Sequence, residues 1–178
     1  MLKIIQRSVL ILFITIFLII ATGLLLPENL IIPVKGATVH NWNPKYFWHC
    51  PWCKGNIVHR GIDIIHKKGT PIISATYGLV IFKGKLGRGG NVVITLGPKW
   101  RIHYYAHLSR FNTEKYSLVK KGTILGYVGN TGASDLPHLH YTIITIVPYF
   151  LRWDNDKLGW QKMFFLNPHK ELINDIKK

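Results

Sequence analysis

The chain has 178 residues, which is room for one folded domain and a short appendage. Hydrophobic residues make up 48% of it and aromatic residues 12%, so a sizeable core can form. The formal net charge is +15, from 23 Lys and Arg against 8 Asp and Glu, and this balance favours anionic partners. The basic residues are scattered rather than gathered in blocks, which indicates a solvated surface and argues against dedicated nucleic-acid binding.

The first 26 residues differ in composition from the rest of the chain. Lys3 and Arg7 precede an uncharged run of 19 residues from Ser8 to Leu26, and Pro27 ends it. About 20 apolar residues span a bilayer as a helix, so we predict one N-terminal transmembrane helix. Because the positive charges precede the run, its N-terminal end is expected in the cytoplasm and the remaining chain outside it.

A cleaved signal peptide is the alternative for residues 1–26. Signal peptides have a shorter apolar region of about 7–15 residues, followed by a small-x-small cleavage site. Ala21-Thr22-Gly23 is only a passable site and lies inside the apolar run, so the sequence favours a retained anchor. A buried core helix is disfavoured because no polar residues mark a surface face.

Residues 27–54 are predicted to form a connector of mostly irregular backbone, since four prolines interrupt it. Cys50 and Cys53 are the two cysteines of the chain, in a C-x-x-C arrangement. In an exported domain a local disulfide is the default expectation. Free thiols, a redox pair or a metal role remain open, although no βαβ context and no second cysteine pair supports the last two. The connector's aromatic residues are expected to cover one rim of the domain: Trp42, Tyr46, Phe47, Trp48 and Trp52.

Short runs rich in Val, Ile, Tyr and Thr, separated by glycine-containing turns, extend from Ile57 to about Val147. This spacing predicts a mainly β fold, an antiparallel β-sandwich or partly open barrel. The tail from Asn167 is predicted to form one short amphipathic helix. The predicted strands are residues 61–65, 71–74, 78–85, 91–96, 101–107, 124–128 and 138–146.

Two pairs of ligand-type residues stand out within this β region. His138 and His140 are two apart on a predicted strand, so their side chains point to the same face. His59 and Asp63 are four apart, and Gly61 between them leaves room for a bend. Two histidines and one carboxylate with an open fourth position form a catalytic zinc arrangement, beside which a neutral histidine can transfer protons. Each pair alone is a weak signal, and the combination is much stronger.

His107 ends another predicted strand and is a further candidate for the same site. His103, four residues earlier, is a weaker candidate because it is expected to share a face with His107.

These motifs, in this order, resemble the lysostaphin/LytM-type metallopeptidases of the M23 family. The resemblance covers roughly residues 56–147, about half of the chain. Three stretches carry it: His59-Arg60-Gly61-Ile62-Asp63-Ile64, Tyr105-Ala106-His107-Leu108, and Gly126–Gly132 followed by Pro137-His138-Leu139-His140-Tyr141.

The resemblance implies a LytM-type fold and one zinc ion (Zn²⁺) per chain, bound by His59, Asp63 and His140. It implies that His138 and His107 are the acid/base and transition-state-stabilising histidines. The implied activity is that of a metalloendopeptidase that cuts peptide bonds in peptidoglycan stems or cross-links. The alternative is a catalytically silent LytM-like module that binds the cell wall or activates amidases, and the intact ligand set argues against it.

The implied location is the cell envelope, with the catalytic domain membrane-anchored on the periplasmic or extracellular side. Residues 55–150 are the predicted peptidase domain, and residues 151–178 are a C-terminal extension expected to pack on the domain or lean on the membrane. Thr142 stands where the family often has an acidic residue, so a contact behind the metal ligands is expected to differ. The bond that is cut, the partners and the oligomeric state are left open.

Overall fold

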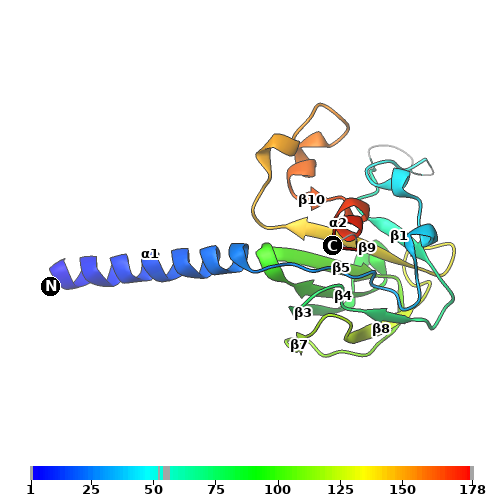
Figure 1. Ribbon diagram of the computed structural model, residues 1–178, viewed down its shortest axis with the longest axis horizontal. Helices are drawn as coiled ribbons and strands as arrows, with labels where there is room; N and C mark the ends of the chain where they lie inside the picture. The colour runs from blue at the N-terminus through cyan, green and yellow to red at the C-terminus, as the bar shows by residue number, and fades with distance from the viewer. Residues whose placement is uncertain (1, 52, 54–56, 177–178) are drawn as a thin grey trace.

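The computed structural model describes residues 2–51, 53 and 57–176, and it shows a long helix projecting from a β domain (Figure 1). The helix is α1 (Leu2–Leu25), and a second helix, α2 (Pro168–Ile176), packs on the domain near the end of the chain. The strands are β1 (Ile62–Ile65), β2 (Pro71–Ile73), β3 (Gly78–Lys85), β4 (Asn91–Leu96), β5 (Arg101–Ala106), β6 (Leu108–Phe111), β7 (Leu118–Val119), β8 (Ile124–Val128), β9 (His138–Thr145) and β10 (Phe165–Leu166).

Two antiparallel sheets make up the domain. Among the described residues, the larger sheet has the strand order β1-β9-β5-β4-β3-β7, with β10 also paired to β9, and the smaller sheet has the order β2-β8-β6. The predicted mainly β, antiparallel fold is confirmed. Strand β9 lies between β1 and β5, and its residue His140 pairs with Asp63 of β1 and with Ala106 of β5. The core includes the fully buried Tyr105 and Tyr141 from these central strands.

Three of the predicted strands, residues 78–85, 91–96 and 124–128, have the bounds observed, and the other four differ by one residue at an end. Strands β6, β7 and β10 were not predicted. The predicted strand 101–107 ends at Ala106 because His107 has a φ of 66°, which no extended strand accommodates. The chain then leaves the larger sheet, and Leu108–Phe111 pairs with β8 in the smaller one. The predicted C-terminal helix is present as α2.

The connector is irregular, as predicted, yet it is packed against the domain. Val34 forms an isolated bridge with Ile72, and Trp42 is 6% exposed and donates its indole N–H to Nδ1 of His169 at 3.2 Å. The predicted disulfide joins Cys50 and Cys53. Trp52, which was expected at the rim, lies outside the described residues.

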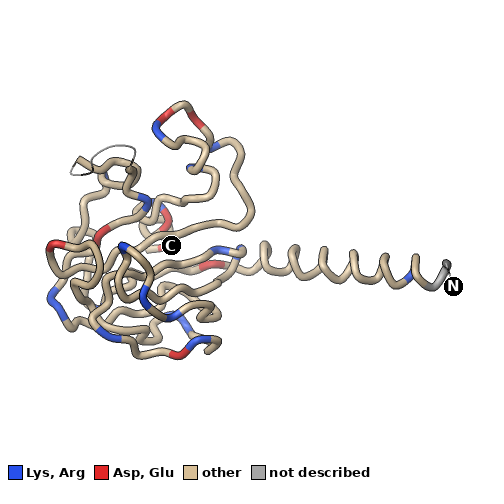
Figure 2. Tube along the Cα trace, turned by 180° about the vertical axis from the view of Figure 1, so that it is seen from behind, with Lys and Arg blue, Asp and Glu red and all other residues tan. Residues whose placement is uncertain are grey.

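Helix α1 extends away from the β domain, and its residues 5–20 are all exposed (Figure 1). Its segment Ile5–Leu25 has 21 residues and is long and apolar enough to cross a membrane, and only 6% of the apolar window is buried. Charged residues colour this helix only near its N-terminal end, whereas Lys and Arg are scattered over the β domain (Figure 2). The helix is therefore a candidate transmembrane span by length and composition.

Candidate metal centre

His59 and Asp63 reach the site from the start of β1. His59 precedes the strand, and Asp63 is its second residue, paired in register with His140 of β9. Gly61 lies so close to β9 that an added Cβ would stand 2.4 Å from the carbonyl oxygen of Tyr141. A side chain at this position would push the strand away from β9, so glycine is what lets the first two ligand-type residues approach the third.

The side chains of His59, Asp63 and His140 converge on one point. Asp63 Oδ1 lies 2.7 Å from His140 Nδ1 and 3.1 Å from His59 Nε2, and the two histidine nitrogens are 3.1 Å apart. A tetrahedral zinc ion with bonds of about 2.0–2.1 Å separates its ligand atoms by about 3.3 Å. The three atoms therefore have the chemistry and the spacing of a two-histidine, one-carboxylate zinc site.

The other nitrogen of each of these two rings is engaged by a group behind the site. The carbonyl oxygen of Tyr46 lies 3.1 Å from His59 Nδ1, which directs Nε2 toward Asp63. His140 Nε2 lies 3.0 Å from the hydroxyl of Thr142, which directs Nδ1 toward the same carboxylate. Such contacts orient metal-binding histidines. The Thr142 hydroxyl thus makes this contact at the position where an acidic residue often stands in the family.

His107 and His138 form the opposite wall of the site, with ring centroids 4.7 Å apart. Each ring is held by a backbone carbonyl on its Nδ1: that of Thr131 at 2.7 Å for His107, and that of Leu136 at 2.8 Å for His138. His138 Nε2 lies 3.5 Å from Asp63 Oδ1, so this ring faces the convergence point without being the closest contact. All five predicted site residues are therefore brought together.

The electrostatics of the site divide its titratable groups into two kinds. Burial raises the pKa of Asp63, but hydrogen bonds from the three neighbouring imidazoles outweigh it and hold that pKa well below its usual range. Burial lowers the pKa of His107 to about 4, despite its hydrogen bond to the Thr131 carbonyl. Burial also lowers the pKa of His138, but the hydrogen bond and charge of Asp63 reverse the shift and leave it raised. At neutral pH the site therefore offers an ionised carboxylate and a neutral His107.

An open cleft of about 1760 Å³ surrounds these residues. Its walls include the connector from Val39 to Tyr46, the turn at Arg88 and Gly89, and the loop that precedes β9. Tyr104 also lines the cleft, with its ring 6.2 Å from that of His140, and was not predicted as a site residue. Strand alternation puts Tyr104 on the same face as Ala106, but only the pairing of Ala106 with His140 shows that this face lines the cleft.

The expectation that His103 shares a face with His107 is wrong. His103 is 0% exposed and points to the other face of β5, where its Nδ1 lies 2.8 Å from the Tyr141 hydroxyl. A separation of four residues keeps the same face only within one continuous strand. The positive φ of His107 ends the strand first and turns its side chain into the cleft.

Comparison with known proteins agrees with the observed fold. Residues 57–149 match the model of peptidase family M23, which is just over half of the chain. The protein belongs to peptidase family M23, and the sequence resemblance is confirmed.

Individual relatives match the same part of the chain. The DD-carboxypeptidase/endopeptidase Mpg of Neisseria meningitidis serogroup B is 40% identical over 84 residues, 47% of this chain and 19% of that protein. The peptidoglycan DD-endopeptidase ShyA of Vibrio cholerae is 34% identical over 104 residues, 58% of this chain and 24% of that protein. The chain thus spans about a fifth to a quarter of the length of these curated relatives.

A solved structure shares the fold. The catalytic domain of the antimicrobial peptidase lysostaphin from Staphylococcus simulans superimposes with a TM-score of 0.54 and 27% sequence identity. The match covers 65% of this chain and 80% of that domain.

Proposed function

We propose that this protein is a zinc-dependent endopeptidase that hydrolyses peptide bonds in peptidoglycan stems or cross-links. The observation that carries the proposal is the convergence of His59, Asp63 and His140, with mutual distances of 2.7–3.1 Å, beside two further histidines. These three residues would hold the ion. When bound in such a site, zinc polarises a carbonyl and acidifies water.

The remaining residues act on the proton and on the scissile carbonyl. Because its pKa is lowered to about 4, His107 is neutral at neutral pH and its ring can exchange a proton or hydrogen-bond to developing charge. The pKa of His138 is raised, so His138 is protonated more readily than His107. A base and an acid on the same wall of the cleft are what amide hydrolysis requires, since the attacking water loses a proton and the leaving amine gains one.

The substrate class rests on the relatives, one of which is named a peptidoglycan DD-endopeptidase. The open cleft suits a branched polymer better than an enclosed pocket would. The alternative is a silent module that binds the cell wall or activates amidases. A complete ligand set with both flanking histidines favours the enzyme, because a module without catalysis has no need of either.

The deciding experiment measures zinc content and peptidoglycan cleavage in single variants of the full-length chain purified in detergent. We expect His59→Ala, Asp63→Ala and His140→Ala to be zinc-poor and inactive, because each removes a ligand. We expect His107→Ala and His138→Ala to keep close to one zinc per chain and to lose about 10²–10⁴-fold in rate.

His66→Ala is the matched control, because this histidine lies outside the cleft with Nδ1 2.8 Å from the Thr70 hydroxyl. It should retain both zinc and activity. Loss of zinc in His138→Ala with retention in His140→Ala would reverse the two assignments. A wild-type chain that binds zinc and releases no peptide fragments would support the silent module instead.

We also propose that α1 anchors the protein in the membrane, with its N-terminal end in the cytoplasm and the catalytic domain on the outer side. Support comes from the length and exposure of the apolar helix and from the basic residues before its apolar run. A full-length chain that remains in the membrane fraction after a high-salt wash meets this expectation. A mature N-terminus near Leu24 in a soluble fraction would indicate a cleaved signal.

A further inference from the structure

An apolar segment lies on the surface of the domain directly after β9. Residues 146–153, here called the apolar segment, connect β9 to the C-terminal part of the chain and include η5 (Phe150–Arg152). Leu151 is 102% exposed and Phe150 72%, which is unusual for large apolar side chains in water. Its other exposed hydrophobic residues are Ile146, Val147, Tyr149 and Trp153.

The apolar segment is fixed to the place where α1 enters the domain. Ile146 donates its backbone N–H to the carbonyl of Trp100 at 3.2 Å, and the Trp100 indole donates to the carbonyl of Ile20 in α1 at 2.9 Å. Gly23 lets the indole lie directly on the helix, since an added Cβ would stand 2.2 Å from that ring. One tryptophan therefore contacts both α1 and the start of the apolar segment.

A second link restrains the same region. Arg101, which follows Trp100, forms an ion pair with Glu28 just after α1, and its Nη2 lies 3.3 Å from the Tyr149 hydroxyl. Both partners of the ion pair are 6% exposed. The end of α1, the first strand residue of β5 and the apolar segment are thus held together, so the segment keeps its position relative to the helix.

The apolar segment lies on the flank of the domain from which α1 leaves, as the yellow-orange stretch after β9 shows in Figure 1. Figure 2 shows the same flank from behind, with the chain again reaching out to the level at which the helix enters. A membrane crossed by α1 would have its surface at this level. Tyrosine and tryptophan, which accompany the aliphatic residues here, are the residues enriched at membrane–water interfaces.

We propose that the apolar segment is a second membrane contact, which inserts Phe150 and Leu151 into the lipid interface beside α1. This inference rests on the proposed anchorage by α1. A lipid surface is the occupant favoured over a protein partner because the segment is attached to the emerging end of the apolar helix. Two contacts, unlike one, fix the orientation of the domain on the membrane.

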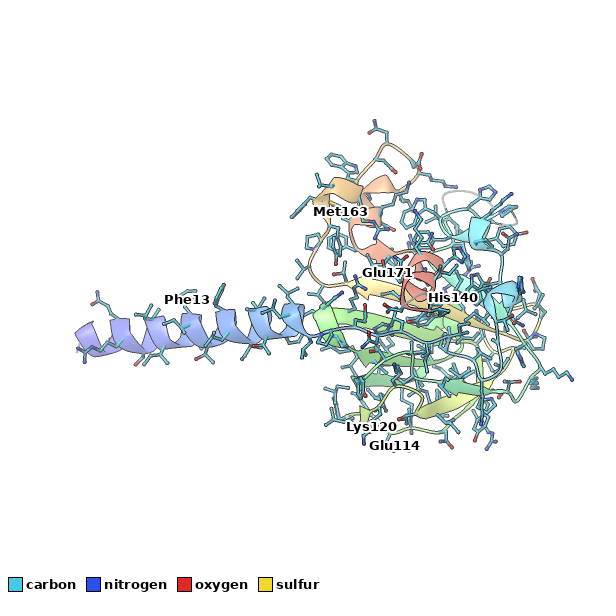
Figure 3. All side chains as sticks on the ribbon, in the orientation of Figure 1. Phe13, Glu114, Lys120, His140, Met163 and Glu171 are labelled. Carbon is cyan, nitrogen blue, oxygen red and sulfur yellow. A yellow bond between two sulfur atoms is a disulfide. The ribbon has the colours of Figure 1, made fainter. Side chains whose placement is uncertain are left out.

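The fixed orientation sets the distance of the active site from the membrane surface. His140 lies on the side of the domain away from α1 (Figure 3). Six residues of extended chain separate it from Ile146 at the membrane end, and a strand rises about 3.3 Å per residue, so the separation is at most about 20 Å. The cleft is thereby directed away from the lipid, toward substrate that lies within about this distance of the membrane.

The test places a fluorophore at Leu151→Cys in the full-length chain, reconstituted in phosphatidylcholine vesicles with spin-labelled lipids as quenchers. Cys50 and Cys53 are paired in a disulfide, so the new thiol is labelled selectively. Leu86→Cys is the matched control, an exposed leucine just beyond the end of β3. Lys85 at this end pairs with Asn91, at the opposite end of β4 from Leu96, whereas α1 contacts Trp100 just after Leu96. We expect at least several-fold stronger quenching at position 151 than at position 86.

Flotation of the same vesicles after a high-salt wash separates this inference from the anchorage on which it rests. A chain that does not float with the vesicles contradicts the anchorage. A chain that floats but shows equal quenching at the two positions, or none at either, overturns the membrane contact of the apolar segment alone. Stronger quenching at position 86 would mean that the domain faces the membrane with its cleft end.

Discussion

Two clusters of histidine and carboxylate lie on opposite faces of the larger sheet, and they differ in access. In the cleft, Asp63 lies among three imidazole rings whose nitrogens face a shared space. On the other face, Glu28 lies 3.3 Å from His103 Nε2 and forms an ion pair with Arg101. His103 is 0% exposed, and that cluster is sealed inside the protein.

The comparison shows that residue types alone do not make a metal site. The buried carboxylate of Glu28 is compensated by a guanidinium, which neutralises it and fills the space a cation would take. Within the described part of the chain, the ion-pair partners of Asp63 are histidines, which can act as metal ligands when neutral, and the cleft gives access to them. We therefore expect metal dependence in the cleft cluster and a contribution to folding from the buried one.

Removal of the metal is the change expected to have the largest effect. A chelator should abolish peptidoglycan cleavage, and added zinc should restore it. Zinc polarises the scissile carbonyl and acidifies water, which the side chains that bind it cannot do alone. The fold should persist, since the core between the sheets does not include the ligands. Cleavage and far-ultraviolet circular dichroism, measured before and after chelation, check both statements. Full activity in the metal-free chain would mean that the cleft cluster does not act through a metal, and the proposed difference between the two clusters would be wrong.

Arg101→Met tests the buried cluster and is the next largest effect. The substitution leaves Glu28 buried without its guanidinium, which typically costs about 3–5 kcal/mol in the free energy of unfolding. Zinc content per folded chain should not change. Urea unfolding of the full-length chain in detergent, followed by circular dichroism, measures the loss.

Lys83→Met is the matched control for that loss. Lys83 pairs at 2.6 Å with Glu114, whose side chain is 81% exposed, and exposed pairs contribute about 0.2–1 kcal/mol. Arg101 also pairs with Glu171 at 2.9 Å, whose side chain is 29% exposed against 2% for Glu28. The double variant Arg101→Met, Glu28→Leu should be more stable than Arg101→Met alone, because it removes the more deeply buried of the two carboxylates. If Arg101→Met costs no more than Lys83→Met, the buried cluster does not stabilise the fold.

Short-range rules predicted the β fold and the shared face of His138 and His140, whereas the M23 resemblance assigned all five cleft residues to one site. Alternation along one strand puts His138 and His140 on the same side, and the bounds of residues 91–96 follow from turn signals on either side. The M23 resemblance supplied the relation between β1 and β9, which no local pattern contains.

The rest depended on contacts that a local pattern cannot show. The φ of 66° at His107 separates β5 from β6, and it also sends His103 and His107 to different faces. Strand β10 is two residues long and exists through its pairing with β9. The position of Tyr104 in the cleft follows from the pairing of β5 with β9, which is a tertiary contact.

Thr142→Val tests the contact behind His140 and has the smallest expected effect. The Thr142 hydroxyl lies 3.0 Å from His140 Nε2. When Nδ1 of this ring binds zinc, as proposed, the ring proton is on Nε2, and that N–H donates to the hydroxyl. Valine keeps the shape and removes the acceptor, which leaves the ring less well oriented. Loss of such a contact typically weakens metal binding about 10–100-fold. Competition with a chromogenic chelator measures the zinc affinity of the purified chain.

Thr145→Val is the control for this change because it lies on the same strand with similar burial, 2% exposed against 4% for Thr142. Its hydroxyl donates to the carbonyl of Val147 at 2.8 Å, far along β9 from His140. Both variants lose one hydrogen bond, so both should lose a similar amount of stability, about 1 kcal/mol. Only Thr142→Val should lose zinc affinity. Equal affinities in the two variants would mean that Asp63 and the packing of the ring orient His140 without the hydroxyl, and that the departure from an acidic residue at this position has no consequence for the metal.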